Sequence, residues 1–242
     1  MHRFYADDIA ETLVLPEEES RHAARVLRLA EGDEVEVVDG HGMLYRCRIA
    51  LSHPKRTAVE IVERLPQPPH WGAKIVLAIA PTKNMDRLEW AAEKCTEMGI
   101  DRIIPVLCEH SERKVLKCER LAKILVAAMK QSLKATLPEL DELTPLSELL
   151  SAPFDGQKFI AYCDMSLPRE QRLDFAREYR PEADALILIG PEGDFSPAEV
   201  EAALQAGFVP VSLGQSRLRT ETAAVYACAT THAIKEKTAK SK

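Results

Sequence analysis

The sequence predicts an α/β protein in which a parallel sheet with crossover helices follows a smaller, β-rich unit. From Lys74 onward, apolar runs of strand length alternate with stretches of helical periodicity, which is typical of strand–helix–strand units. The first 65 or so residues instead hold three β-rich runs separated by short turns. Between the two parts, residues 65–72 read LPQPPHWG, a proline-rich linker. We therefore expect one domain over residues 1–70 and a second over residues 71–242.

In the first part, a helix is expected before the strands. Pro16 and the three glutamates after it suit a first helical turn, because the helix dipole favours acids there. A helix that ends at Gly32 places one apolar face at i, i+3, i+4 and i+7, formed by Ala23, Val26, Leu27 and Ala30. It places a second face of arginines alone, formed by Arg21, Arg25 and Arg28. The strands that follow, at 34–40, 43–51 and 57–65, predict a small antiparallel barrel or sheet.

In the second part, five buried-type strands are expected at 74–80, 102–107, 158–163, 185–190 and 208–214. Helices are expected at 84–98, 119–134, 168–179, 197–206 and 220–237. Ligands of such sheets bind at the carboxyl ends of the strands, so the loops at those ends are the first place to search for a site.

Composition sets limits on function. Of the 242 residues, 46% are hydrophobic and 29% charged, an ordinary globular balance, and the net charge of −6 does not favour a nucleic-acid-binding protein by bulk charge. No apolar run approaches the ~18 residues of a membrane helix, and the acidic N-terminal stretch does not resemble a signal peptide. The six cysteines form no C-x-x-C pair, which predicts reduced thiols and a cytoplasmic location. The seven histidines are scattered, so no metal site is expected.

Two loops at carboxyl ends of predicted strands stand out: GPEGDFS after ALILIG, and LGQSRLRTETA after FVPVS. Neither matches the glycine patterns of phosphate loops or dinucleotide folds. Gly190, Gly193 and Gly214 would allow the backbone to approach a purine-like ligand, with Leu213 and Leu218 against its faces. A single glycine of this kind is more often part of an ordinary turn, but two such loops together favour a binding site.

The start of the last predicted helix carries the second functional signal. Thr220 or Thr222 can cap this helix, and Glu221 suits its first turn. Arg219 is unexplained, because a cation at a helix N-terminus is unfavourable. We therefore expect Arg219 to face an anionic partner or reacting group.

The segments LILIGPEGDFSPAEV and SLGQSRLRTETAAVYA resemble the SPOUT methyltransferases, a class with a C-terminal trefoil knot that binds S-adenosylmethionine (SAM). Over nearly its whole length the chain is similar to the RsmE family within that class, which methylates N3 of a uridine in 16S ribosomal RNA. The motifs MHRFY, RHAARVLRL and PTKNMDRLEWAAEKCTEMGIDRIIPVLCEHSERK carry this likeness. The resemblance implies an α/β knot, an N-terminal PUA-like β-barrel that binds RNA, and a homodimer acting on the small ribosomal subunit.

By the same resemblance, the loops around the methyl donor contain the cofactor-binding residues Gly190, Glu192, Gly193, Leu213, Gly214, Leu218, Arg219 and Thr220. Arg219 would stabilise the uracil anion that forms as the N3 proton leaves, and Glu221 or water would take that proton. A helix-capping role for Glu221 is an equal alternative. The candidate RNA contacts are Arg3, Arg21, His22, Arg25, Arg28, Lys83 and Arg87, with Arg46 and Arg48 on the same N-terminal unit.

The chain departs from the family pattern at two places. Asp194 stands where the family prefers a second glycine, and residues 130–134 read KQSLK where it prefers Glu-Gln-Ser-Gly-Arg. By the resemblance, residues 130–134 would line the entrance for the RNA, so this departure concerns the contacts to the RNA rather than those to SAM. Two other functions stay open, namely a SPOUT methyltransferase for another RNA such as transfer RNA, and a non-catalytic RNA-binding or ribosome-assembly protein. A small-molecule enzyme that binds phosphate at the glycine loop is a more distant alternative, since no Walker spacing follows the loop.

Overall fold

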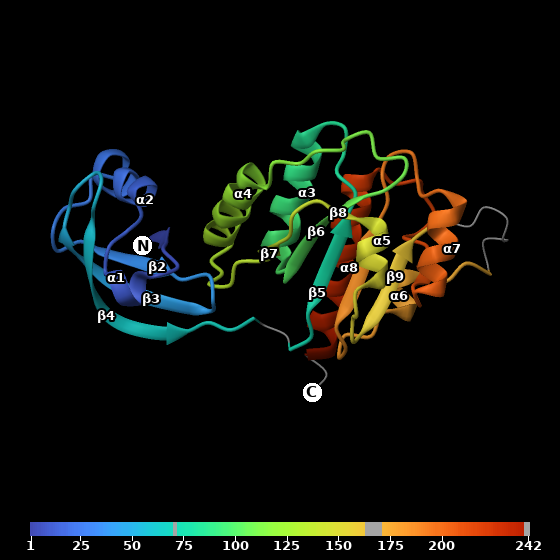
Figure 1. Cartoon of the computed structure of the whole chain (residues 1–242). Coiled ribbons are helices and arrows are strands. Elements are labelled where there is room, and N and C mark those ends of the chain that lie inside the picture. Colours follow the sequence, from blue (N-terminus) through green and yellow to red (C-terminus); the bar gives the residue numbers. More distant parts are fainter. Residues whose placement is uncertain (70–71, 163–170, 240–242) are drawn as a thin grey trace. The chain divides into compact units, whose positions relative to one another are not determined.

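A computed structural model of the chain describes residues 1–69, 72–162 and 171–239, which fall into two compact units (Figure 1). The N-terminal unit comprises Met1–His70 and Val126–Leu137. The C-terminal unit comprises Trp71–Leu125 and Pro138–Lys242. The inclusion of residues 126–137 in the N-terminal unit was not expected from the sequence. Among the described helices, none combines the length and the apolar character that a membrane span requires.

The N-terminal unit is built on a four-stranded sheet. Its strand order is β1 (His2–Tyr5), β2 (Glu34–Val38), β3 (Met43–Leu51) and β4 (Ala58–Pro66). The three predicted strands are confirmed and pair antiparallel, with register shifts that bend β3 against β4. The strand β1 was missed, and it pairs parallel to β2. Alternate side chains of these strands, including Phe4, Val35, Val37, Cys47 and Ile49, form one buried core.

The predicted continuous helix from Pro16 to Gly32 is wrong. After the short α1 (Ile9–Thr12), α2 (Glu17–Arg21) passes directly into one turn of π-helix, His22–Val26. The backbone then leaves the helix at Arg28, whose φ is 55°. Because the wider π-turn changes the angular spacing of the side chains, Val26 is 69% exposed instead of lying on the apolar face. The strand β3 holds the chain that follows, since the Gly32 amide donates to the Ile49 carbonyl at 2.8 Å.

The segment Val126–Leu137 joins the N-terminal unit through the last turns of α4 (Cys118–Gln131). Met129 and Ala135 are buried against Val38 and Leu44. Lys130 forms an ion pair with Glu19, and both side chains are largely buried. These contacts are non-local, so no periodicity within residues 126–137 could indicate them.

The C-terminal unit contains a parallel sheet whose described strands have the order β11-β9-β10-β5-β6-β7, with β8 beside β6. The strands are β5 (Ile75–Ile79), β6 (Arg102–Leu107), β7 (Glu139–Leu140), β8 (Thr144–Pro145), β9 (Gln157–Ala161), β10 (Ala185–Ile189) and β11 (Val209–Val211). All five predicted strands are confirmed: β6 has the predicted bounds, and β5, β10 and β11 are shorter than predicted. The strand β9 begins one residue earlier and ends at Ala161, and Cys163 of that prediction lies outside the described residues. The two-residue β7 and β8 were missed. From its carboxyl end, β5 is followed by β6 on one side of the sheet, whereas β10 is followed by β11 on the other side. A topological switch point therefore lies between β5 and β10.

The helices of this unit are α3 (Met85–Met98), the first part of α4, α5 (Leu146–Ser151), α6 (Phe175–Glu178), α7 (Pro197–Gln205) and α8 (Thr220–Ala239). The Asn84 side chain caps α3, and Gly99 ends it in a left-handed conformation. Ser196 and Glu199 form a complete capping box on α7. The helix predicted over 168–179 is observed only as α6, and residues 168–170 lie outside the described residues.

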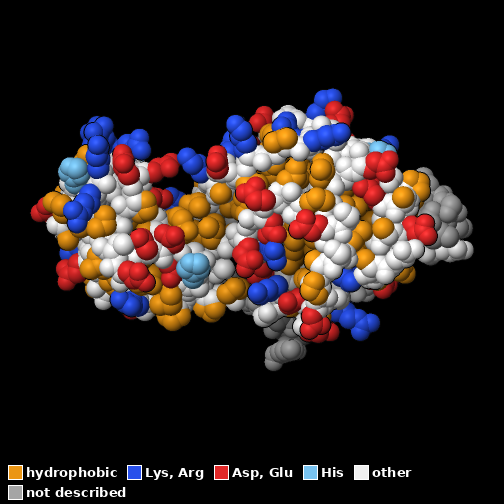
Figure 2. Space-filling model, viewed as in Figure 1, with side chains coloured by type: hydrophobic (Ala, Val, Ile, Leu, Met, Phe, Trp, Pro, Cys, Tyr) orange, Lys and Arg blue, Asp and Glu red, His pale blue; other side chains and the backbone are white. Residues whose placement is uncertain are grey.

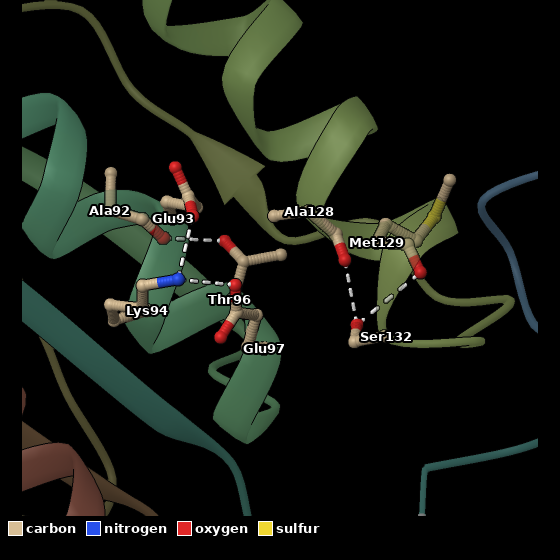
Figure 3. A network of polar contacts seen from close by, with 8 residues as sticks. All are labelled: Ala92, Glu93, Lys94, Thr96, Glu97, Ala128, Met129 and Ser132. Atoms are coloured by element: carbon tan, nitrogen blue, oxygen red, sulfur yellow. Dashed lines mark hydrogen bonds and ion pairs between the residues drawn. The ribbon is translucent and has the colours of Figure 1, made fainter.

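Helices cover both faces of the sheet (Figure 1). One face buries β-strand residues with Leu146 and Leu149 of α5 and Val200 and Ala203 of α7. On the other face α8 packs along α3, β5 and β10. Polar side chains of α3 and α4 bond within their own helices (Figure 3): Lys94 pairs with Glu93 and Glu97, and Thr96 and Ser132 donate to carbonyls four residues earlier. Because α8 packs along α3, β5 and β10, the start of α8 lies at the carboxyl end of β10.

Candidate active site

Four loops follow the carboxyl ends of β5, β6, β10 and β11, at residues 80–84, 108–117, 190–196 and 212–219. The strands β10 and β5 end in register, Ile189 opposite Ile79, on the two sides of the switch point. The Ala80 amide donates to the Ile189 carbonyl at 3.0 Å, so the first and third loops leave the sheet together. The fold therefore gathers these loops where an open α/β sheet binds its ligand.

The glycine loop at 190–193 is tightly packed by its neighbours. A Cβ added to Gly190 would lie 2.8 Å from the Phe195 ring, and one added to Gly193 would lie 2.9 Å from the Cβ of His110. The His110 ring Nδ1 lies 3.0 Å from the Asp194 carbonyl oxygen. Close packing within the protein therefore accounts for both glycines, in agreement with the alternative that they belong to an ordinary turn. The case that this loop binds a ligand depends on the position of the loop at the switch point.

The neighbouring loops are bonded to this one through their backbones. The Lys83 amide donates to Glu192 Oε1 at 3.1 Å, and the Glu109 amide donates to Glu199 Oε1 at 2.7 Å. Glu192 itself is exposed. The carboxylate of Glu192 therefore links the loop after β5 to the glycine loop.

The loop after β11 is largely exposed and contains the second group of predicted cofactor residues. Gly214 has a φ of 103°, and its carbonyl accepts a hydrogen bond from the Ser212 hydroxyl at 2.9 Å. Leu213 and Leu218 are half-buried. Their apolar side chains and the free backbone groups of this loop suit a flat heteroaromatic ligand.

The start of α8 joins the two predicted loops. The expectation that Thr220 caps the last helix is wrong, because α8 begins at Thr220 itself and the residue that precedes it is Arg219. The Thr220 hydroxyl donates to the Gly190 carbonyl at 3.0 Å. The Arg219 side chain is exposed and has no hydrogen-bond or ion-pair partner within the described part of the chain. Its backbone carbonyl accepts a hydrogen bond from the Ala223 amide at 2.8 Å. Arg219 is therefore an unpaired cation at a helix N-terminus, beside the glycine loop.

Glu221 lies one residue further, with its side chain 10% exposed. Its Oε1 lies 3.8 Å from Nε of Arg87 on α3, too long for a hydrogen bond. Its Oε2 is buried and has no hydrogen-bond partner among the described residues. A buried carboxylate oxygen without a donor costs free energy, so this oxygen is suited to accept a hydrogen bond from a ligand.

The candidate RNA contacts divide into three groups. Arg21, His22, Arg25 and Arg28 are all exposed on α2 and the residues after it, where Figure 2 shows a group of basic side chains. Arg3 does not belong with them: its side chain is 8% exposed and donates twice to Glu36, because it faces the parallel β1–β2 pair. Arg46 and Arg48 are paired with Glu63 and Glu34.

Lys83 and Arg87 lie in the C-terminal unit, at the carboxyl end of β5. Beside Lys83, a surface pocket of about 380 Å³ is lined by Lys83, Glu112, Arg113, Lys114 and Val115. The last four residues were not among the predicted site residues, although the segment HSERK is basic and follows a predicted strand directly. Among the described residues, no group of three or more His, Cys, Asp or Glu side chains is placed to hold a metal ion.

Two protein-family profiles match the two parts of the chain. The profile of the RNA methyltransferase domain matches residues 69–232, and that of the RNA methyltransferase PUA domain matches residues 15–62. The two profiles define the class as an RNA methyltransferase with a PUA domain.

Individual relatives narrow the class. A crystal structure of a probable rRNA-methyltransferase from Porphyromonas gingivalis has a TM-score of 0.91 and 42% identity, covering 98% of this chain and all of that one. The ribosomal RNA small subunit methyltransferase E of Neisseria gonorrhoeae, bound to S-adenosyl methionine, has a TM-score of 0.83 and 27% identity over 97% of this chain and 98% of that one. The enzyme of that name from Aquifex aeolicus is 29% identical, with 93% and 96% covered. The chain belongs to the RNA methyltransferase family that contains the ribosomal RNA small subunit methyltransferases E.

Proposed function

We propose that this protein transfers a methyl group from SAM to N3 of a uridine in 16S ribosomal RNA. The observation that carries the proposal is the bond between Thr220 and Gly190, which joins the glycine loop to the helix start bearing Arg219. Two loops far apart in sequence thereby form one site at the switch point of the sheet. The relative with bound SAM and the shared fold over nearly the whole chain support the same conclusion.

The residues present suit SAM. Backbone groups of 190–193 and 213–218 offer donors and acceptors for an adenine edge, and the half-buried Leu213 and Leu218 offer apolar contact to its faces. The carboxylates of Glu192 and Glu221 suit a positively charged sulfonium, and the orphan Oε2 of Glu221 is open to a donor. When bound, SAM supplies an electrophilic methyl group. We further propose that these loops form the trefoil knot of the SPOUT class and that the site is completed in a homodimer.

Arg219 has the most direct role in the proposed reaction. N3 of uracil becomes nucleophilic only as its proton leaves, and negative charge then develops on the base. An exposed guanidinium with no partner in the described protein is free to stabilise that charge. Either Glu221 or water accepts the proton. In the first case Arg87, 3.8 Å from Glu221, holds the carboxylate in position.

The basic group on α2 and the π-turn supplies the contact to the RNA backbone, with Arg21, His22, Arg25 and Arg28 exposed together. The target base leaves its stack to reach the donor. The five described cysteines are free thiols, as expected of a protein acting on ribosomal RNA in the cytoplasm.

The test is methyl transfer from labelled SAM to small ribosomal subunits and to free 16S RNA, followed by nucleoside analysis. We expect N3-methyluridine with the unaltered protein. Arg219→Ala should lower kcat by about 10²–10³-fold, the usual effect of removing one group that stabilises a developing anion. Arg217→Ala is the matched control, because Arg217 is an exposed arginine of the same loop, and it should change kcat little.

SAM affinity, measured by calorimetry, separates the alternatives. Binding of SAM with methyl transfer only to transfer RNA would reassign the substrate. No binding of SAM would exclude the enzyme and leave an RNA-binding or ribosome-assembly protein. If Arg219→Ala and Arg217→Ala have equal activity, Arg219 does not stabilise the anion of the uracil base.

A further inference from the structure

The pocket beside Lys83 has a defined wall. The Arg113 guanidinium donates to the Lys83 carbonyl at 2.8 Å and to the Thr82 carbonyl at 3.3 Å, so it ties the loop after β6 to the loop after β5. Within the loop after β6, the Ser111 hydroxyl accepts a hydrogen bond from the Cys108 amide at 3.0 Å. Leu116, two residues beyond Lys114, is buried. The position of Arg113 in the pocket lining is therefore fixed by its two bonds to the backbone of the loop after β5.

The charge of the pocket is positive. Its lining includes three cations, Lys83, Arg113 and Lys114, and one carboxylate, Glu112. Lys83 Nζ lies 2.7 Å from Glu112 Oε2, and the hydrogen bond to Glu112 is the main cause that raises the pKa of Lys83. Within residues 1–69, 72–162 and 171–239, Lys114 has no such partner. A concave surface with an unpaired lysine and an arginine fixed at its wall suits a phosphate group.

The pocket adjoins the proposed methyl-transfer site. The backbone amide of Lys83 donates to Glu192 in the glycine loop, so the residue that lines the pocket also contacts the cofactor loop. Both features lie in the C-terminal unit, so this proximity depends on no arrangement between the two units. Figure 2 shows basic side chains among acidic ones over this end of the C-terminal unit.

We propose that this pocket binds a backbone phosphate of the RNA substrate next to the nucleotide that is methylated. The proposal rests on the proposed function, because it takes RNA as the substrate. Lys114 and Lys83 contact the phosphate, Arg113 holds the wall, and Glu112 releases Lys83 when the phosphate arrives. Glu112 thus competes with the RNA for Lys83, which limits the affinity of the free pocket.

Two substitutions with opposite expected effects on RNA affinity test the role of this pocket. Lys114→Ala should weaken binding to unmodified 16S RNA severalfold and lower the slope of log K against log salt by about 0.7 to 0.9, the value for one phosphate contact. Glu112→Gln should tighten binding and steepen the slope, because it removes the competing carboxylate. Lys117→Ala is the control, since Lys117 is an exposed lysine of the same loop outside the pocket. It should leave both quantities nearly unchanged.

The kinetics separate this proposal from the one on which it rests. Lys114→Ala should raise KM for RNA while kcat at saturating RNA and SAM affinity stay unchanged. Direct RNA binding tests the pocket even where the unaltered protein transfers no methyl group. Equal losses in Lys114→Ala and Lys117→Ala, or weaker binding by Glu112→Gln, would overturn the proposal. Inhibition of RNA binding by millimolar inorganic phosphate that Lys114→Ala does not change would overturn it as well.

Discussion

At the scale of single residues, both departures from the family pattern include a position with left-handed backbone. Asp194 has a φ of 65°, and Leu133 has a φ of 59°. Glycine would avoid strain at both positions, since a side chain in this conformation costs about 1–2 kcal/mol. Asp194 reduces this cost locally, because its Oδ1 accepts a hydrogen bond from the Phe195 amide at 2.9 Å. An aspartate can thus replace the glycine without disturbing the loop.

Leu133 has no such compensation. It lies two residues after the end of α4, where the Lys134 amide donates to the Met129 carbonyl and the Leu133 amide donates to the Lys130 carbonyl. This pair of bonds is the Schellman motif, in which glycine is the usual residue. The Leu133 side chain is 63% exposed, so little packing is lost with it.

We therefore predict that Leu133→Gly stabilises the N-terminal unit by about 1 kcal/mol. The measurement is the free energy of unfolding from a urea titration, followed for each variant by a probe in the unit that contains the substitution. Leu204→Gly is the matched control, since Leu204 is an exposed leucine inside α7, where glycine should cost about 1 kcal/mol. A loss of stability in Leu133→Gly would contradict the steric argument.

At the scale of elements, α8 connects the site to the opposite edge of the sheet. Its first residues form the site, and near its other end Lys235 is buried and donates to the Ala73 carbonyl at 2.5 Å. Burial lowers the pKa of Lys235 to about 8, and nearby Asp101 and Asp184 oppose that effect. Those two carboxylates accept hydrogen bonds from the amides of Ile75 and Lys74, at the start of β5.

The sign of the resulting pH dependence follows from proton binding. Between pH 8 and 10.5 the unfolded chain keeps the Lys235 proton and the folded chain loses it, so the free energy of unfolding rises with pH. A shift from 10.5 to about 8 corresponds to at most about 3 kcal/mol across this window. We predict that this rise disappears in Lys235→Met.

The measurement is urea unfolding at pH 7, 8, 9 and 10 for the unaltered protein and the variant. Their difference isolates Lys235 from cysteines and tyrosines that titrate in the same range. Lys237→Met, at an exposed position of the same helix, should keep the pH dependence of the unaltered protein. A difference curve that is flat with pH would show that Lys235 titrates as an ordinary lysine.

At the scale of the whole molecule, RNA binding must come from local charge, because the net charge is −6. The exposed arginines of α2 and the π-turn are the group best suited to this, whereas Arg46 and Arg48 are neutralised by Glu63 and Glu34. The π-turn and the left-handed Arg28 give this group an irregular backbone, which is frequent at functional sites.

We predict that replacing Arg21, Arg25 and Arg28 together by alanine weakens 16S RNA binding by more than tenfold. It should also lower the salt slope by about 2, since roughly 0.7 to 0.9 is lost for each phosphate contact. The matched control is Arg46→Ala with Arg48→Ala, which should change the slope by less than about 0.5. If both variants weaken RNA binding equally, RNA affinity depends on the total charge of the protein rather than on the arginines of α2 and the π-turn. Circular dichroism checks that both variants remain folded.

The sequence by itself determined the alternation of strands and helices, the extent of α3 to within one residue, and the two loops that carry the proposed site. These features depend on residues close together in the chain, such as Asn84 and Gly99 at the ends of α3. The glycine loop and the Arg219 turn could be named from motifs for the same reason.

Only the tertiary structure decided which of these residues act together. The Thr220 hydroxyl bonds Gly190 rather than its own helix, and Arg3 is paired with Glu36 rather than exposed. The segment 126–137 joins the N-terminal unit, and Arg113 and Lys114 line a pocket with Lys83. Each of these outcomes depends on contacts between residues some 30 or more positions apart. Local sequence patterns do not predict such contacts, because the partners meet only when the sheet packs.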